Sequence, residues 1–140
     1  EHIDEVRMAQ ELSGGQQQRL AFARAILPDF TVLFGDEPTG NLDSDNAVKA
    51  MELLSAKLNE LDGSSAIIVS HDMHLSATFA DIIIKIRKES RPVKDVKDEV
   101  TYYGVIDDTC IFVPSQDRKE WSNGKETYES AEFELFLKKI

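Results

Sequence analysis

Two segments in the first half of the chain place apolar residues at three- and four-residue steps, the period of an amphipathic helix. The first, residues 13–27, begins with Ser13-Gly14-Gly15-Gln16, which has the S-x-x-Q form of a capping box. Pro28 ends this segment because proline cannot continue a helix. The second segment, residues 44–61, ends before Asp62-Gly63. We therefore predict two helices in this half of the chain.

Short apolar runs that read as strands alternate with these helices. Residues 31–35 lead directly into Asp36-Glu37, and residues 66–69 form a β-branched run without polar alternation. Runs of that kind are typical of strands buried on both faces in parallel sheets. Strand, helix, strand is a βαβ unit with a right-handed crossover. We predict an α/β fold whose third strand, residues 81–86, follows a short helix at residues 75–79 and joins the same sheet.

The composition changes at Lys88. Residues 88–99 are dominated by charges and contain Pro92, which favours a linker or exposed loop. Beyond it we predict a small ββα extension, with strands at residues 100–106 and 110–113, a turn at residues 122–124 and a helix at residues 130–140. The expected organisation is residues 1–87 as one lobe, 88–99 as linker and 100–140 as extension.

The extension has too few residues to fold with ease by itself. A module of roughly 40 residues usually needs a disulfide or a metal. The chain has one cysteine, Cys110, so it can form no intramolecular disulfide and no multi-cysteine zinc site. We therefore expect the extension to share a core with the preceding lobe or to pair with a second copy.

Charge and composition exclude several classes of function. Twenty-six acidic residues against 16 basic ones give a formal net charge of −10, which argues against a nucleic-acid-binding surface. Apolar runs such as residues 82–84 are far shorter than the roughly 20 residues of a membrane helix. A single cysteine fits a reducing compartment. The chain begins with Glu1 rather than Met, which suggests a piece of a longer protein.

Three segments carry candidate chemistry. Ser13 and the two glycines after it open a helix, where unpaired N–H groups and the helix dipole suit a phosphate. The bland alternative is a plain helix cap. Asp36-Glu37 follows a buried strand, where one carboxylate can hold Mg²⁺ while the other polarises an attacking water. His71 follows the next strand and can donate a hydrogen bond to a phosphate oxygen. The plain alternatives are that Asp36 and Glu37 are solvated acids at a strand end and that His71 is a surface or packing residue.

The order and wording of these segments resemble the ATP-binding subunits of ABC transporters. Residues 12–27, LSGGQQQRLAFARAIL, resemble the signature motif and the helix behind it. Residues 32–43, VLFGDEPTGNLD, resemble the Walker B strand and D-loop, and residues 67–72, IIVSHD, resemble the switch-histidine segment. The resemblance covers roughly residues 8–87, and the EPTGNLD wording is closest to the lipoprotein-release and macrolide-export subfamily.

The resemblance implies a role for each candidate residue. Asp36 would support Mg²⁺, Glu37 would be the catalytic base, Asp43 would communicate across the dimer, and His71 would contact the γ-phosphate. Four further residues would contact ATP bound to the opposite subunit of a head-to-tail dimer: Ser13, Gly14, Gly15 and Gln16. The implied protein is cytoplasmic, attached to the inner face of the membrane through membrane-spanning transporter subunits that it drives.

Two features depart from the family pattern. Gly35 stands where the family usually has a larger apolar residue or alanine, and no G-x-x-x-x-G-K-[ST] sequence occurs in the chain. That loop cradles the phosphates, and its Lys and Ser/Thr reach the phosphates and Mg²⁺. We therefore expect the chain to be the C-terminal part of a P-loop NTPase domain of ABC type plus the extension. It would be an ATPase in its full-length context and inactive alone.

Two alternatives remain open from the sequence. ATPases of DNA repair and chromosome maintenance share a related signature, and their C-terminal lobes lack a P-loop. The chain could also be a non-catalytic regulatory or interaction fragment. The upstream sequence would separate these, because a transporter subunit has its P-loop within one compact domain.

Overall fold

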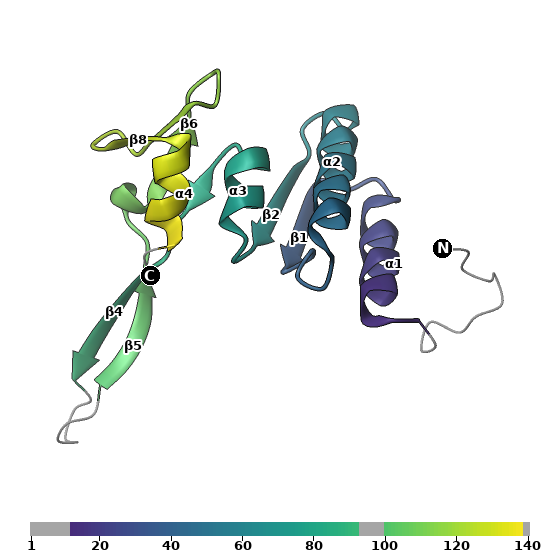
Figure 1. Cartoon of the computed structure of the whole chain (residues 1–140), viewed down its shortest axis with the longest axis horizontal. Coiled ribbons are helices and arrows are strands. Elements are labelled where there is room, and N and C mark those ends of the chain that lie inside the picture. Colours follow the sequence, from purple (N-terminus) through teal and green to yellow (C-terminus); the bar gives the residue numbers. More distant parts are fainter. Residues whose placement is uncertain (1–11, 93–99, 139–140) are drawn as a thin grey trace. The chain divides into compact units, whose positions relative to one another are not determined.

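The computed structural model describes residues 12–92 and 100–138 (Figure 1). Predicted features in residues 1–11, 93–99 and 139–140, including most of the expected linker and the end of the last helix, lie outside the described residues. The chain divides into two compact units, Glu1–Asp72 and Met73–Ile140. This boundary lies before the one expected at residue 87, because residues between 73 and 87 belong to the core of the second unit.

The first unit is built around a parallel strand pair. Helix α1 (Gly14–Ile26) precedes strand β1 (Val32–Asp36), and helix α2 (Ser44–Glu60) connects β1 to strand β2 (Ser65–Val69). The two strands pair in parallel, with Phe34 opposite Ile67. The predicted βαβ unit is therefore confirmed, with α2 as its crossover helix (Figure 1).

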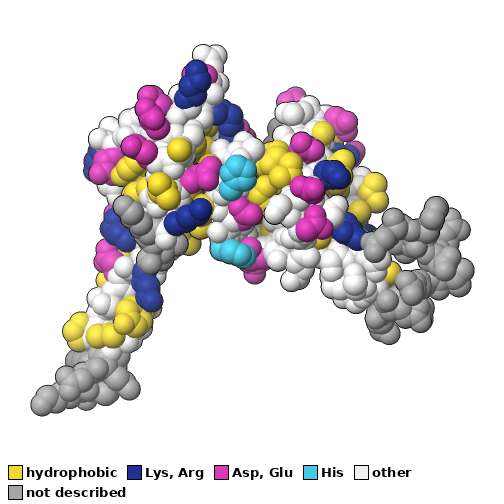
Figure 2. All heavy atoms as spheres, viewed as in Figure 1, with side chains coloured by type: hydrophobic (Ala, Val, Ile, Leu, Met, Phe, Trp, Pro, Cys, Tyr) yellow, Lys and Arg dark blue, Asp and Glu magenta, His cyan; other side chains and the backbone are white. Residues whose placement is uncertain are grey.

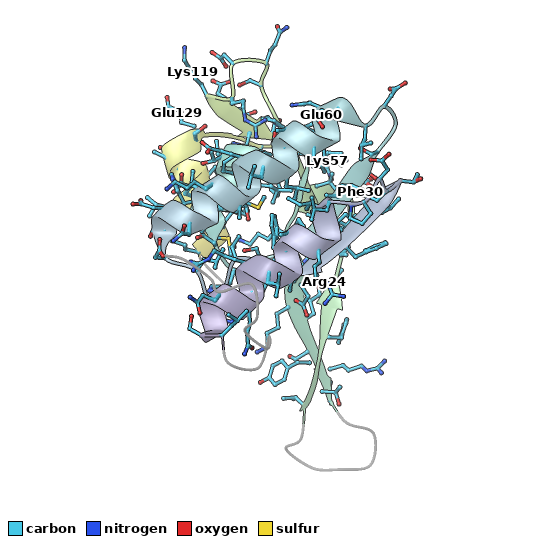
Figure 3. All side chains as sticks on the ribbon, turned by 90° about the vertical axis from the view of Figure 1, so that its right-hand side faces the viewer. Arg24, Phe30, Lys57, Glu60, Lys119 and Glu129 are labelled. Atoms are coloured by element: carbon cyan, nitrogen blue, oxygen red, sulfur yellow. The ribbon has the colours of Figure 1, made fainter. Side chains whose placement is uncertain are left out.

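Local sequence chemistry places the helices of this unit. Ser13 caps α1 in the predicted capping box, and Asp43 caps α2. Helix α2 buries Ala47, Ala50 and Leu54. Figure 3 labels Lys57 on α2. Its Nζ forms an ion pair with Oδ1 of Asp29, 2.8 Å away in the segment between α1 and β1.

One face of the strand pair is exposed. Along both strands exposed and half-buried residues alternate, which differs from the predicted burial on both faces. Four large apolar side chains lie on the exposed positions: Val32, Phe34, Ile67 and Val69. The side chain of Phe34 is 74% exposed. The described residues therefore cover only one face of these two strands.

The second unit has an aromatic core between a sheet and two helices. It contains α3 (Met73–Phe79), β3 (Ile83–Ile84), β6 (Ile111–Pro114), β7 (Glu120–Ser122), β8 (Thr127–Glu129) and α4 (Ser130–Lys138). The four strands form an antiparallel sheet in the order β3-β6-β7-β8. Phe112, Trp121 and Phe133 are fully buried in the core, and the rings of Trp121 and Phe133 stack with centroids 5.0 Å apart.

This core corrects the prediction for the third strand. Residues 83–84 do not join β1 and β2 but pair antiparallel with β6, Ile83 opposite Phe112. Met73, Ala80 and Ile83 pack against the aromatic core. The expected shared core is therefore present between the extension and residues that were assigned to the lobe, which is why the unit boundary lies at residue 72.

A β-hairpin replaces part of the predicted linker. Strand β4 (Arg87–Pro92) pairs antiparallel with β5 (Val100–Val105), so the linker prediction is wrong for residues 88–92. Lys88 Nζ lies 4.3 Å from the ring centroid of Tyr102 across the ladder. Figure 2 shows apolar and basic side chains exposed together on this hairpin. A 3-10 turn, η2 (Asp108–Cys110), leads from β5 to β6. These two strands of the predicted extension pair with different strands, β5 with β4 and β6 with β3 and β7.

Truncation after residue 87 is expected to lower solubility. The shortened chain would retain Met73, Ala80 and Ile83 but lose the aromatic side chains that cover them, which uncovers apolar surface. A second truncation after Asp72, at the unit boundary, is the control and should stay in solution better. The measurement is the soluble fraction by size-exclusion chromatography. Equal solubility of the full chain and the residue-87 truncation would contradict the shared core.

Candidate functional site

The C-terminal ends of β1 and β2 bring two predicted site residues together. Glu37 directly follows β1, and its backbone N–H donates to the Val69 carbonyl at the end of β2, 2.9 Å away. His71 lies two positions beyond β2. The parallel pairing of β1 and β2 therefore brings Glu37 and His71 together at one edge of the strand pair.

One carboxylate oxygen of Glu37 makes two contacts with His71. Glu37 Oε1 accepts a hydrogen bond from the His71 backbone N–H at 2.9 Å and lies 2.8 Å from His71 Nδ1. The hydrogen bond and the negative charge of Glu37 raise the pKa of His71, and the charge of Asp72 adds to this. The imidazole is 79% exposed and the carboxylate 37%, so a ligand can reach the pair.

The raised pKa of His71 predicts a pH dependence. The protonated ring is favoured in the folded state, so its contribution to stability is present below the ordinary histidine pKa and is lost as pH rises through the raised value. Replacing Glu37 with glutamine should move the NMR titration midpoint of His71 to lower pH, because the charge and the ion pair are removed. A midpoint that is the same in both proteins would contradict the contact.

Glu37 has an unusual backbone conformation. Its φ is +46°, in the left-handed region that residues with a Cβ rarely adopt. Conformations of this kind persist where surrounding contacts hold them, and they cluster at functional sites. The Glu37 carbonyl accepts from Gly40 N–H at 3.1 Å and from Gln18 Nε2 at 2.9 Å. Two hydrogen bonds to the Glu37 carbonyl therefore stabilise the turn at residues 37–41.

Gly35 is explained by the same turn. A Cβ at this position would lie 2.8 Å from Ile68 Cδ1 and 3.3 Å from Pro38 Cγ. The absence of a side chain therefore leaves room for the Ile68 side chain of β2 and for the ring of Pro38. This departure from the resembled family has a local packing reason.

The residues that open α1 form the predicted cap. Ser13 Oγ accepts from Gln16 N–H at 3.3 Å, and Gln16 Oε1 accepts from Ser13 N–H at 2.9 Å. Ser13 and Gly14 are exposed, and a Cβ at Gly14 would meet nothing within 4 Å. Helix-cap geometry is therefore confirmed, while the phosphate-binding role of Ser13, Gly14, Gly15 and Gln16 stays a prediction.

Asp43 and Asp36 have different surroundings. Asp43 caps α2 by accepting from the backbone and side-chain N–H groups of Asn46, and these bonds, with the charge of Arg19, hold its pKa below the ordinary value. Asp36 ends β1 at an exposed position. A single exposed carboxylate fits Mg²⁺, which keeps several waters and takes its other ligands from phosphates. In the described part of the chain no group of three or more His, Cys, Asp or Glu side chains could hold a metal ion.

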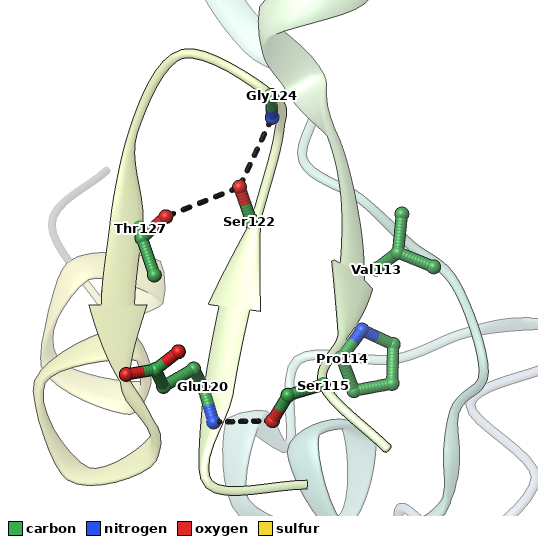
Figure 4. Close-up of a pocket in the computed structure, with 7 residues that line it drawn as sticks. All are labelled: Val113, Pro114, Ser115, Glu120, Ser122, Gly124 and Thr127. Atoms are coloured by element: carbon green, nitrogen blue, oxygen red, sulfur yellow. Dashed lines mark hydrogen bonds between the residues drawn. The ribbon is translucent and has the colours of Figure 1, made fainter.

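A shallow pocket in the second unit contains none of the predicted site residues. Figure 4 shows it along β6, β7 and β8, with Ser115, Ser122 and Thr127 among its lining residues. Ser115 Oγ accepts from Glu120 N–H, and Ser122 Oγ accepts from Gly124 N–H and from Thr127 Oγ1. The Ser115 hydroxyl stabilises the turn between β6 and β7, and the Ser122 hydroxyl stabilises the turn between β7 and β8.

Sequence reasoning missed Gln18, whose side-chain amide contacts the turn that follows β1. Its only signal was a polar residue at a position of α1 that the structure half buries.

No helix among the described residues has both the length and the apolar character to cross a membrane.

Comparison with known proteins gives the class of protein. The family described as ABC transporter matches residues 1–40. The solved dimeric structure of MJ0796, a bacterial ABC transporter cassette, superposes with a TM-score of 0.50 at 45% identity, covering 56% of this chain and 33% of that one. The fold of this chain is accordingly that of part of an ABC ATPase cassette.

Three relatives give the type within this class. The chain is 48% identical over 77 residues to an uncharacterized ABC transporter ATP-binding protein, MJ0796, of Methanocaldococcus jannaschii, covering 55% of this chain and 32% of that protein. It is 54% identical over 67 residues to the lipoprotein-releasing system ATP-binding protein LolD of Syntrophotalea carbinolica, covering 48% and 29%. It is 41% identical over 108 residues to the macrolide export ATP-binding/permease protein MacB of Campylobacter fetus, covering 77% and 16%.

The chain is thus similar to part of an ABC transporter ATP-binding subunit of the LolD- and MacB-like type, which agrees with the resemblance found in the sequence. The chain spans about a third or less of the length of the relatives it matches. The DNA-repair alternative has no support among these relatives.

Proposed function

We propose that the first unit is part of the ATP-hydrolysing domain of a transporter that moves its substrate across a membrane. The observation that carries this is the contact of Glu37 with His71 at the C-terminal edge of the parallel strands, where ligands bind in open α/β sheets. The LolD and MacB relatives, which take part in lipoprotein release and macrolide export, support the transport role.

Glu37 acts as the general base in this proposal. Its carboxylate polarises the water that attacks the γ-phosphate of ATP. The two contacts from His71 hold Oε1 in place, and the left-handed turn presents the carboxylate beyond the end of the strand. With Nδ1 held by Glu37, Nε2 of the protonated ring is the nitrogen available to donate to a phosphate oxygen.

The remaining predicted residues bind the nucleotide and the second subunit. Asp36 would hold Mg²⁺, which neutralises charge that develops on the phosphates. The exposed end of α1, Ser13–Gln16, would contact ATP bound to a second ATPase subunit, and Asp43 would lie at the same dimer interface. The dimeric MJ0796 cassette supports a dimer. Membrane-spanning subunits would be the further partners, which places the protein at the cytoplasmic face of the membrane.

The exposed apolar face of the strand pair supports a larger domain. Val32, Phe34, Ile67 and Val69 together present apolar surface that folded domains rarely leave in water. The chain matches only about a third of the MJ0796 cassette. We infer that further segments of the ATPase domain, including the P-loop, cover this face in the full-length protein.

Replacing Ser13 with arginine should block dimer formation while one subunit still binds ATP. The added bulk and charge fall on the exposed end of α1, which in this proposal meets the partner's nucleotide. The measurement is size-exclusion chromatography of the full-length protein with ATP, in a Glu37→Gln background that prevents turnover. Ala56→Arg, on an exposed position of α2, adds the same group elsewhere and should leave the dimer intact. A dimer that forms equally well with Ser13→Arg would reduce Ser13 to a helix cap.

A further inference from the structure

The side chain of Gln18 bridges helix α1 and the two sides of the turn that carries Glu37. Gln18 Nε2 donates to the Glu37 carbonyl at 2.9 Å, and Gln18 Oε1 accepts from the Asn41 backbone N–H at 2.8 Å. A single planar amide therefore uses its donor on residue 37 and its acceptor on residue 41. Gln18 is half buried, and its bond to the Glu37 carbonyl is partly shielded from water.

The turn needs such support. Glu37 has φ +46°, and a left-handed conformation at a residue with a Cβ is strained and persists only where its surroundings hold it. Inside the turn, Gly40 N–H donates to the Glu37 carbonyl and Leu42 N–H to the Thr39 carbonyl. These short-range bonds shape the turn but do not attach it to α1.

A second close approach brings α1 onto the same turn. A Cβ at Gly15 would lie 3.2 Å from the Asn41 carbonyl oxygen, so the absence of a side chain allows the first turn of α1 to lie against residue 41. Gly15 and Gln18 are three positions apart and share a face of the helix. The close approach of Gly15 and the two hydrogen bonds of Gln18 therefore both join α1 to one segment, residues 37–41.

We propose that Gln18 is a positioning residue that couples the exposed N-terminal end of α1 to the carboxylate of Glu37. Because the Gln18 amide is bonded to residues 37 and 41, the position of α1 and the position of the Glu37 backbone depend on each other. The bridge is a property of this chain, whereas its effect on turnover rests on the proposed function. The two are therefore tested separately.

The bridge is tested in the 140-residue chain by NMR measurement of amide exchange with water. Gln18→Leu removes both hydrogen bonds at similar volume, and Gln18→Glu keeps the acceptor for Asn41 but loses the donor to Glu37. In Gln18→Leu we expect the Asn41 amide to exchange up to about tenfold faster, the equivalent of one hydrogen bond. In Gln18→Glu the Asn41 amide should stay protected.

The positioning role has a readout at a residue that Gln18 does not touch. The His71 amide donates to Glu37 Oε1, so it should exchange faster in both Gln18 variants if Gln18 holds residue 37 in place. Gln17→Leu is the matched control, because Gln17 is the adjacent glutamine of α1 and donates to the Leu12 carbonyl instead. Unchanged His71 exchange in folded Gln18→Glu, or equal acceleration by Gln17→Leu, would overturn the proposal.

Turnover by the full-length protein tests the catalytic consequence. Gln18→Glu should lower kcat by about tenfold with the KM for ATP unchanged, because the base is misplaced while the nucleotide contacts remain. Gln17→Leu should keep normal kcat. An unchanged kcat in Gln18→Glu would overturn the coupling to catalysis. If Glu37→Gln also leaves turnover normal, the proposed function fails, and the amide exchange still decides whether the bridge exists.

Discussion

Replacing Glu37 with glutamine is expected to lower ATP turnover of the full-length protein at least about 10²-fold, the low end for the loss of a general base. Glutamine keeps an oxygen that can accept from the His71 N–H, so the turn should be preserved. It removes the proton acceptor and the negative charge. ATP binding should therefore survive while hydrolysis is lost.

Two measurements separate these effects. Phosphate release gives turnover, and titration calorimetry gives the affinity for ATP with Mg²⁺. Glu52→Gln, an exposed position of α2, is the matched control and should retain normal turnover. Normal hydrolysis by Glu37→Gln would mean that another group is the base.

The second large effect is expected in the aromatic core. Phe133 is fully buried, its ring stacks on Trp121 and its centroid lies 5.0 Å from that of Phe112. Phe133→Ala should destabilise the second unit by about 3–5 kcal/mol, the usual cost of removing a buried phenylalanine. A loss of that size consumes much of the stability of an ordinary domain.

The chain's one tryptophan, Trp121, reports on this core directly. Thermal or urea unfolding followed by its fluorescence should shift strongly in Phe133→Ala. Leu135→Ala on the same helix is the control, because Leu135 is 61% exposed and its loss should cost at most about 0.5 kcal/mol. Similar unfolding of the two variants would contradict the packing of α4 on the sheet.

Much of the first unit could be predicted because its signals are local. The S-x-x-Q pattern before α1 requires only neighbouring backbone groups, and the structure has the reciprocal hydrogen bonds of Ser13 and Gln16. The period of apolar residues in α2 and the runs in β1 and β2 predicted the βαβ unit that the register confirms. Parallel pairing then brings Glu37 and His71 to one edge, so their contact followed from topology.

The second unit was predicted less well because its pairing depends on distant residues. Ile83 and Ile84 look like one more strand of a parallel sheet, yet they pair with β6, almost 30 positions later in the chain, next to Phe112. Lys88–Pro92 look like a solvated linker because they are polar. Their ladder partners in β5 and the Lys88–Tyr102 contact make them a strand. A two-stranded hairpin of this kind, with both faces largely exposed, leaves little periodic signal in a sequence.

The sequence by itself determined the Ser13 cap, the βαβ order and the residue types at the site, because each depends on neighbours along the chain or on the fixed geometry of a crossover. Only the tertiary structure decided the left-handed backbone of Glu37, the bridge from Gln18 and the strand partners of the second unit. These features join groups far apart in sequence. Such contacts depend on which surfaces pack together, and no local pattern encodes that choice.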